Sequence, residues 1–363
     1  MPISAVDTIT LAFQHTKRQL LQPFRFWQWT RLAIVGLLAG EMGSGGSFNF
    51  PTNFNIPRDS GSSRNLLAAR LPKIDPAILG AVIVVLIVAG LTFAVVMTYI
   101  SSVMRFILFD SVLTRECHIR AGWARRQDPG WKFFLWQLGY MLVMLAGMAV
   151  LLGVPAALAY SVGWFSAPSE HLLALVLGGM VVFCLLVIFL VAAAVVHVLT
   201  KDFVVPQMAL EGIGAIEGWR RLWPMLQTEK QGYAIYVGMK IVLAIGAGIA
   251  IGIASLLLGL IIAVPAIGVA IAAAVAGKTT GMTWNVFTIT GAIVGGCILL
   301  AVFLYVIALV SVPATVFFPA YSLYFFAPRY RALSLALYPP PPGSTTGSPP
   351  QDLPPSPAPQ PAG

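Results

Sequence analysis

The sequence predicts an all-α, polytopic transmembrane helical bundle, and three observations support that fold class. The chain is 58% hydrophobic and only 10% charged, whereas soluble domains average about 25% charged residues. Its apolar residues are grouped into long uncharged runs. The net charge of +9 comes from basic residues beside these runs, which suits a membrane with an anionic cytoplasmic face better than a nucleic acid.

Five uncharged runs each exceed the ~20 apolar residues that span a hydrocarbon core. They cover residues 76–104, 133–169, 171–200, 241–277 and 279–328. Each run is expected to form one long helix. Pro265 and Pro313 leave open the alternative that the last two runs each break into two spans.

The N-terminal segment, residues 1–23, is predicted to be an interfacial amphipathic helix. Its apolar residues are mixed with His15, Lys17 and Arg18, a composition typical of helices that lie on a membrane surface.

Residues 24–40 begin with an aromatic and basic cluster, which is typical of a membrane interface. The apolar part, residues 32–40, is too short to span alone. It spans if counted from Phe24, with Arg25 and Arg31 extending toward the headgroups. The prediction is therefore about six spans within a membrane domain of residues 24–330.

The distribution of basic residues predicts the orientation. With six spans, 17 of the 22 Lys and Arg residues fall on the side that holds both termini, and cytoplasmic loops collect such residues. Both termini are therefore expected in the cytoplasm, with the protein in the cytoplasmic (inner) membrane. Residues 41–75 would form an external loop, and the Pro-rich residues 331–363 a disordered cytoplasmic tail.

Weak internal repeats are also predicted. Residues 105–113, 202–210 and 315–323, each at a cytoplasmic helix exit, align without gaps. Repeats are common in transporters, whose substrate sites form at the repeat interface. The alternative is that any helix leaving a bilayer carries aromatic, proline and arginine residues.

Several short motifs resemble an uncharacterised bacterial family of six-helix integral membrane proteins, similar to the membrane domain attached to some glycerophosphodiester phosphodiesterases. The motifs are Pro23-Phe24-Arg25, Gly43-Ser44-Gly45-Gly46, Phe203-Val204-Val205-Pro206 followed by Glu211-Gly212, and Trp219-Arg220-Arg221. The resemblance implies the fold and the location. In that wider group the hydrolase chemistry belongs to a separate soluble barrel. This chain lacks the Glu-x-Asp metal pair and the His-Arg dipeptide that such a barrel would use.

Two sets of residues are candidate site residues. The first is a hypothetical lipid-headgroup contact, made by Trp123, Arg125, Arg126, Trp219, Arg220, Arg221 and Trp223; its alternative is a solvated loop. The second is a pair of intramembrane polar side chains, His197 and Lys240, which could instead lie at the interface and snorkel. Asp110, five residues after Arg105, is expected to form a local ion pair.

No catalytic, cofactor or metal motif stands out, because the four histidines are scattered and the three cysteines form no pattern. The expected function is a non-enzymatic integral membrane protein, a lipid-contacting scaffold or accessory subunit. Its expected partners are anionic membrane lipids and an unidentified membrane or cytoplasmic protein, with no nucleic acid and no cofactor. The alternative is a small-solute or lipid transporter, or a permease component.

Overall fold

The structure, a computed structural model, describes residues 5–41, 76–165, 169–279 and 286–338. Every regular element in these ranges is a helix. The predicted external loop, apart from Glu41, and the predicted tail beyond Tyr338 lie outside the described residues.

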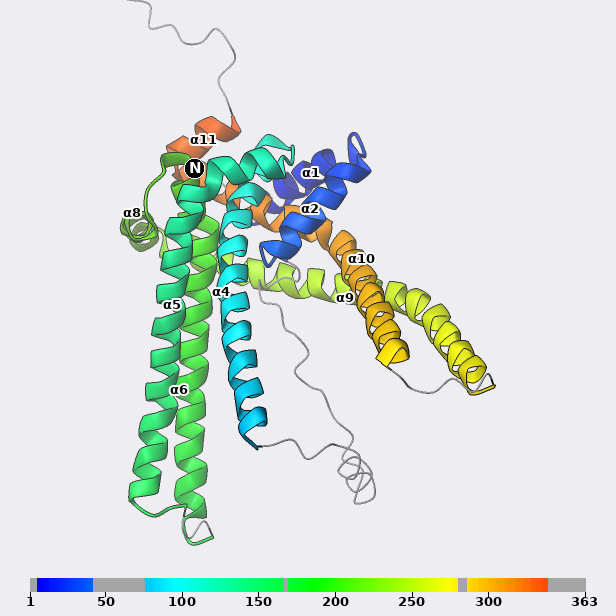
Figure 1. The fold of residues 1–363 in the computed structure, drawn as a ribbon. Helices are drawn as coiled ribbons and strands as arrows, with labels where there is room; N and C mark the ends of the chain where they lie inside the picture. Colours follow the sequence, from blue (N-terminus) through cyan, green and yellow to red (C-terminus); the bar gives the residue numbers. More distant parts are fainter. Residues whose placement is uncertain (1–4, 42–75, 166–168, 280–285, 339–363) are drawn as a thin grey trace, which may run out of the picture.

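The elements follow one another along the chain as shown in Figure 1. They are α1 (Asp7–Leu21), α2 (Phe26–Leu38), α4 (Pro76–Thr114), α5 (Ile119–Ser161), α6 (Leu172–Leu199), the π-helix η1 (Thr200–Val204), α7 (Val205–Glu211), α8 (Ala215–Thr228), α9 (Lys230–Thr279), α10 (Val286–Phe326), the 3₁₀ turn η2 (Ala327–Arg329) and α11 (Arg331–Leu337).

Within the described ranges, five helical segments are long and apolar enough to cross a membrane, which indicates a multi-pass membrane protein. They lie in α4, in α5, in the continuous stretch from α6 to α7, in α9 and in α10. The predicted first span is not among them. Helix α2 has 13 residues, about 20 Å at 1.5 Å per residue, whereas the hydrocarbon core is about 30 Å thick.

The last two apolar runs each form one helix. Helix α9 continues through Pro265 over 50 residues, and α10 continues through Pro313 and Pro319 over 41. Proline is tolerated inside membrane helices because neighbouring groups satisfy the freed carbonyls. Each of these runs therefore forms one long helix rather than two.

The buried side chains gather at one end of the molecule, where α1, α2, α8 and α11 surround the ends of α4, α6 and α10 (Figure 1). This region is termed the packed end. Phe106, Phe203 and Phe326 are fully buried there. In the other halves of the long helices, Leu145 and Leu173 are 69% and 73% exposed. Apolar surface of this kind is suited to lipid.

Helix α1 turns polar side chains toward the protein. His15 Nε2 donates to the carbonyl of Val112 over 3.0 Å, and Gln19 donates to the carbonyl of Ser111 over 2.8 Å. His15 Nδ1 lies 3.1 Å from the hydroxyl of Tyr324 in α10. Burial lowers the pKa of His15, and the charge of Arg115 lowers it further. Helix α1 thus joins the two ends of the sequence at the packed end.

Candidate functional site

A small cavity of about 30 Å³ lies within the packed end. At this size it holds about two water molecules, since one needs roughly 10–15 Å³ measured in this way. Its polar wall is formed by Glu41, Arg105, Lys201, Asp202 and Ser322. A cavity walled by four charged side chains beside apolar helices is the strongest candidate site among the described residues.

The three segments that align in the sequence meet at this cavity. Residues 105–113 contribute Arg105, residues 202–210 contribute Asp202, and residues 315–323 contribute Ser322. Phe109, Pro206 and Pro319, which occupy the same aligned position, also line it. The segments are therefore neighbours in space, and the duplication itself stays a prediction.

The π-helix η1 places two of the charged residues. Pro206 has no N–H to donate to the carbonyl of Asp202, four residues earlier, and its ring crowds that carbonyl. The wider turn at Thr200–Val204 accommodates this, as single π-turns do at many functional sites. Lys201 and Asp202 within that turn both line the cavity.

Two ion pairs are buried beside the cavity. Lys240 pairs with Asp202, and Lys201 pairs with Glu41. The hydroxyl of Tyr236 also donates to Asp202 Oδ2, over 2.9 Å. Charges removed from water need such partners, because the desolvation cost of an unpaired ion is several kcal/mol.

Arg105 is the third buried cation of the cluster and has no carboxylate of its own. Its Nη2 donates to the carbonyl of Ala39 over 3.3 Å, and its guanidinium lies 5.3 Å from the ring centre of Phe133. Its Nε and Nη1 have no hydrogen-bond partner among the described residues. Buried donors of this kind are rare in folded proteins, and each needs an explanation.

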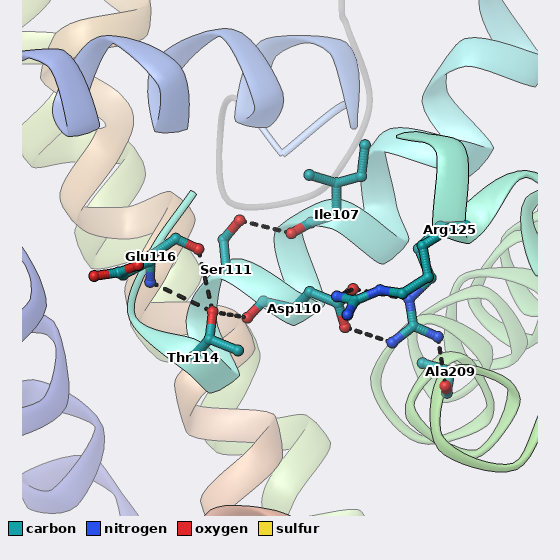
Figure 2. Close-up of polar contacts among 8 residues, drawn as sticks. Ile107, Asp110, Ser111, Thr114, Glu116, Arg125 and Ala209 are labelled. Carbon is teal, nitrogen blue, oxygen red and sulfur yellow. Dashed lines mark hydrogen bonds and ion pairs between the residues drawn. The ribbon is translucent and has the colours of Figure 1, made fainter. Parts of the chain in front are cut away.

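The first pair of predicted lipid-contact arginines is held by Asp110 (Figure 2). Arg126 donates to Asp110 over 2.6 and 2.8 Å, and Arg125 donates over 3.0 Å. Arg126 also donates to the carbonyl of Ala209, over 2.6 Å. The spacing in the sequence predicted a pair with Arg105 instead, which was wrong: the turn between α4 and α5 brings the later arginines back to Asp110.

The predicted tryptophans have different surroundings. Trp123 packs edge-on against Tyr99, with ring centres 6.2 Å apart. Trp219 Nε1 donates to the hydroxyl of Thr200 over 3.0 Å, so this side chain anchors α8 to η1. Trp223, in contrast, is 54% exposed.

Helix α8 has a buried face and an exposed face. Gly218 and Leu222 face inward. Ile216, Arg220 and Trp223 are exposed and follow the i, i+4, i+7 spacing of one helix face. These three residues are termed the outer face of α8. An apolar, a basic and an aromatic side chain on one exposed face are typical of a helix at a membrane surface.

Arg221, also predicted to contact lipid, is paired within the protein. It forms ion pairs with Glu211 and Glu217, and Tyr330 also donates to Glu211. Its guanidinium is therefore engaged at the junction of α7, α8 and α11. Arg220 has a single partner, Glu217 at 3.4 Å, and its side chain is 79% exposed.

The two predicted intramembrane polar residues have different contacts. Lys240 belongs to the buried cluster through Asp202. His197 is partly exposed, and its ring centre lies 6.5 Å from that of Tyr140.

Sequence reasoning did not single out Glu41, Arg105, Lys201 or Asp202 as one site. Each directly follows an apolar stretch, where a charge normally marks the interface. The sequence did show that charged residues of both signs follow three different apolar stretches. Only the fold shows that these residues meet. The described residues contain no cluster of His, Cys, Asp or Glu that could hold a metal ion.

Comparison with curated proteins and with solved structures finds no match for this chain. A family of unknown function, DUF7544, matches residues 3–336. The match includes the packed end, the charged cavity and all five apolar helices. The chain therefore belongs to the DUF7544 family of unknown function.

Proposed function

We propose that this protein is a non-enzymatic scaffold of the cytoplasmic (inner) membrane that contacts anionic lipid headgroups through its packed end. The outer face of α8 is the observation that carries the proposal. Its Arg220 and Trp223 are exposed on a helix that packs against the end of a membrane-crossing segment. A basic residue near an anionic membrane surface adds about 1 kcal/mol of attraction.

The proposed orientation places both termini in the cytoplasm. Helix α1, near the N-terminus, and helix α11, near the C-terminus, lie at the packed end together with α8 (Figure 1). Arg125 lies near the start of α5, and Arg220 lies in α8. A cytoplasmic packed end agrees with the general enrichment of Lys and Arg in cytoplasmic loops.

A second candidate function, a small-solute or lipid transporter, is favoured by the buried charge cluster. Intramembrane charges that pair with one another often mark a substrate or ion pathway. In proteoliposomes, a pH-dependent current that vanishes with Asp202→Asn or His197→Ala would favour transport over the scaffold. We expect no such current, and both variants should insert normally.

The scaffold proposal is tested by the lipid that stays with the purified protein. The variant Arg125→Gln, Arg220→Gln removes two exposed charges, because the side chains are 66% and 79% exposed. We expect it to retain roughly thirtyfold less anionic lipid than wild type, since two charges contribute about 2 kcal/mol. Mass spectrometry of co-purified lipid, after extraction in mild detergent, measures the ratio.

The matched control keeps the charge. Arg125→Lys, Arg220→Lys should retain anionic lipid at nearly the wild-type level, because attraction to the membrane surface depends on charge rather than on guanidinium geometry. Trp223→Ala should release neutral and anionic lipid alike. Unchanged anionic lipid in the Gln variant, with helix content and gel-filtration profile intact, would count against lipid contact and leave these residues as topology signals.

A further inference from the structure

We propose that the cavity beside Arg105 binds one singly charged oxyanion group. The carboxylate of a small solute and the phosphodiester of a phospholipid both have this chemistry. The inference goes beyond the scaffold function, because it concerns a buried site that contact with the membrane surface does not use.

The charge balance of the cluster calls for one more negative group. The cluster holds three cations, the buried Arg105 and Lys240 and the largely buried Lys201, and two buried acids, Glu41 and Asp202. Two of the cations pair with the two acids. One positive charge is left over, and a single negative charge would neutralise it.

Arg105 is the cation of the cluster that has no ion-pair partner among the described residues. It is 6% exposed and lines the cavity, and its Nε and Nη1 donate to no described group. These two nitrogens carry three N–H protons that only an acceptor can satisfy. A neutral water accepts hydrogen bonds but leaves the charge unbalanced, whereas an oxyanion supplies both the acceptors and the charge.

The remaining wall of the cavity limits the size of the ligand group. The space of about 30 Å³ suits a group of a few heavy atoms, because one water occupies roughly a third to a half of it. Leu108, Val205 and Leu323 close the apolar side. The cavity therefore takes the charged group of a ligand, and any larger remainder must lie outside it.

The experiment measures the thermal stability of the full-length protein in nanodiscs. In the soluble arm, discs of neutral phosphatidylcholine are titrated with sodium acetate, against sodium chloride at equal ionic strength. In the lipid arm, phosphatidylglycerol replaces part of the phosphatidylcholine. A ligand that binds only the folded state raises the melting temperature along a saturating curve. We expect this response in at least one arm, and the responding arm identifies the source of the anion.

Two variants test whether the response belongs to the cavity. Arg105→Gln removes the charge, and Ser322→Leu keeps every charge but fills the space. Each should raise the ligand concentration at half-saturation by about tenfold or more, because a hydrogen bond to a charged group is worth about 1.5–3 kcal/mol. Lys132→Gln, which removes an exposed basic residue outside the cavity, should respond like wild type.

The outcomes are distinct. No response of wild type in either arm overturns the inference, as does a full response in both Arg105→Gln and Ser322→Leu. If Arg105→Gln does not yield monodisperse protein, Ser322→Leu decides alone. Loss of lipid retention in the α8 variants has no bearing on the acetate arm, so the scaffold proposal and this one fail separately.

Discussion

Asp110 holds the turn between α4 and α5 closed, because it accepts hydrogen bonds from arginines fifteen and sixteen residues later. Its side chain is 12% exposed, and that of Arg126 is 15% exposed. A carboxylate in this position fixes the start of α5 through Arg125 and Arg126. It does not itself contact lipid in this arrangement. The sequence predicted an ion pair for Asp110 but with the wrong partner, Arg105, since spacing within one helix says nothing about a return of the chain.

Asp110→Asn should destabilise the protein by about 3–5 kcal/mol, because it leaves the buried charge of Arg126 without its counter-ion. The loss is measured by denaturant unfolding in detergent. Asp128→Asn is the matched control. Asp128 pairs with Lys132 on the surface, so its loss should stay below about 1 kcal/mol. Equal losses for the two variants would contradict the structural role of Asp110.

His15 makes stability depend on pH. Burial, followed by the charge of Arg115, lowers its pKa from the ordinary value of 6.5, so the folded state favours the neutral ring. Below pH 6.5 the unfolded state binds more protons, and stability falls as the pH drops toward the folded-state pKa. We expect the melting temperature to decrease between pH 7.5 and pH 5. His15→Gln should make the melting temperature less dependent on pH. An unchanged slope in this variant would contradict the role of His15.

At the scale of elements, hydropathy located the five apolar helices because a long uncharged run has few other stable states in water or lipid. Hydropathy could not predict the π-turn η1. Pro206 was visible in the sequence, but proline predicts a kink as readily as a π-turn. The sequence also did not predict that the polar side chains His15 and Gln19 of α1 point toward the protein. Such side chains occur as often on the exposed surface of an interfacial helix.

The contact between α4 and α5 depends on a glycine. A Cβ at Gly130 would lie 2.6 Å from Val103 Cγ2 and 3.2 Å from Val103 Cα, and the backbone atom cannot move aside. Gly130→Ala should cost about 1–3 kcal/mol through overpacking. Gly139→Ala in the same helix meets nothing within 4 Å and should be neutral or stabilise by up to ~1 kcal/mol. Thermal unfolding of both variants tests this; equal melting temperatures would contradict close packing at Gly130.

At the scale of the whole molecule, topology is the most direct test of the proposed orientation. Reporter fusions after residues 120, 225 and 335 should read cytoplasmic, and fusions after residues 60, 167 and 280 external, because a six-span topology would place 17 of the 22 basic residues on one side. An external signal at residue 335 would mean an odd number of crossings. A cytoplasmic signal at residue 60 would remove the segment of α2 from the spans.

The sequence predicted the all-helical membrane fold but not where its parts meet. The halves of the long helices away from the packed end expose apolar side chains. The composition of the sequence predicts such surfaces directly. The packed end is governed by contacts between distant segments, such as Trp29 with the carbonyl of Leu309. Arg105, Lys201 and Lys240 come together only through such contacts. A single sequence does not show which distant segments touch.

The bond between His15 and Tyr324 spans 309 positions, and this separation bears on the synthesis of the protein. Helix α1 leaves the ribosome long before its partner in α10 has been translated. Throughout elongation, His15 therefore lacks the Tyr324 contact that it has in the finished protein. The packed end can close only after α10 has been translated, so a polypeptide truncated before α10 would leave apolar surface of the packed end uncovered even though its earlier helices have been made.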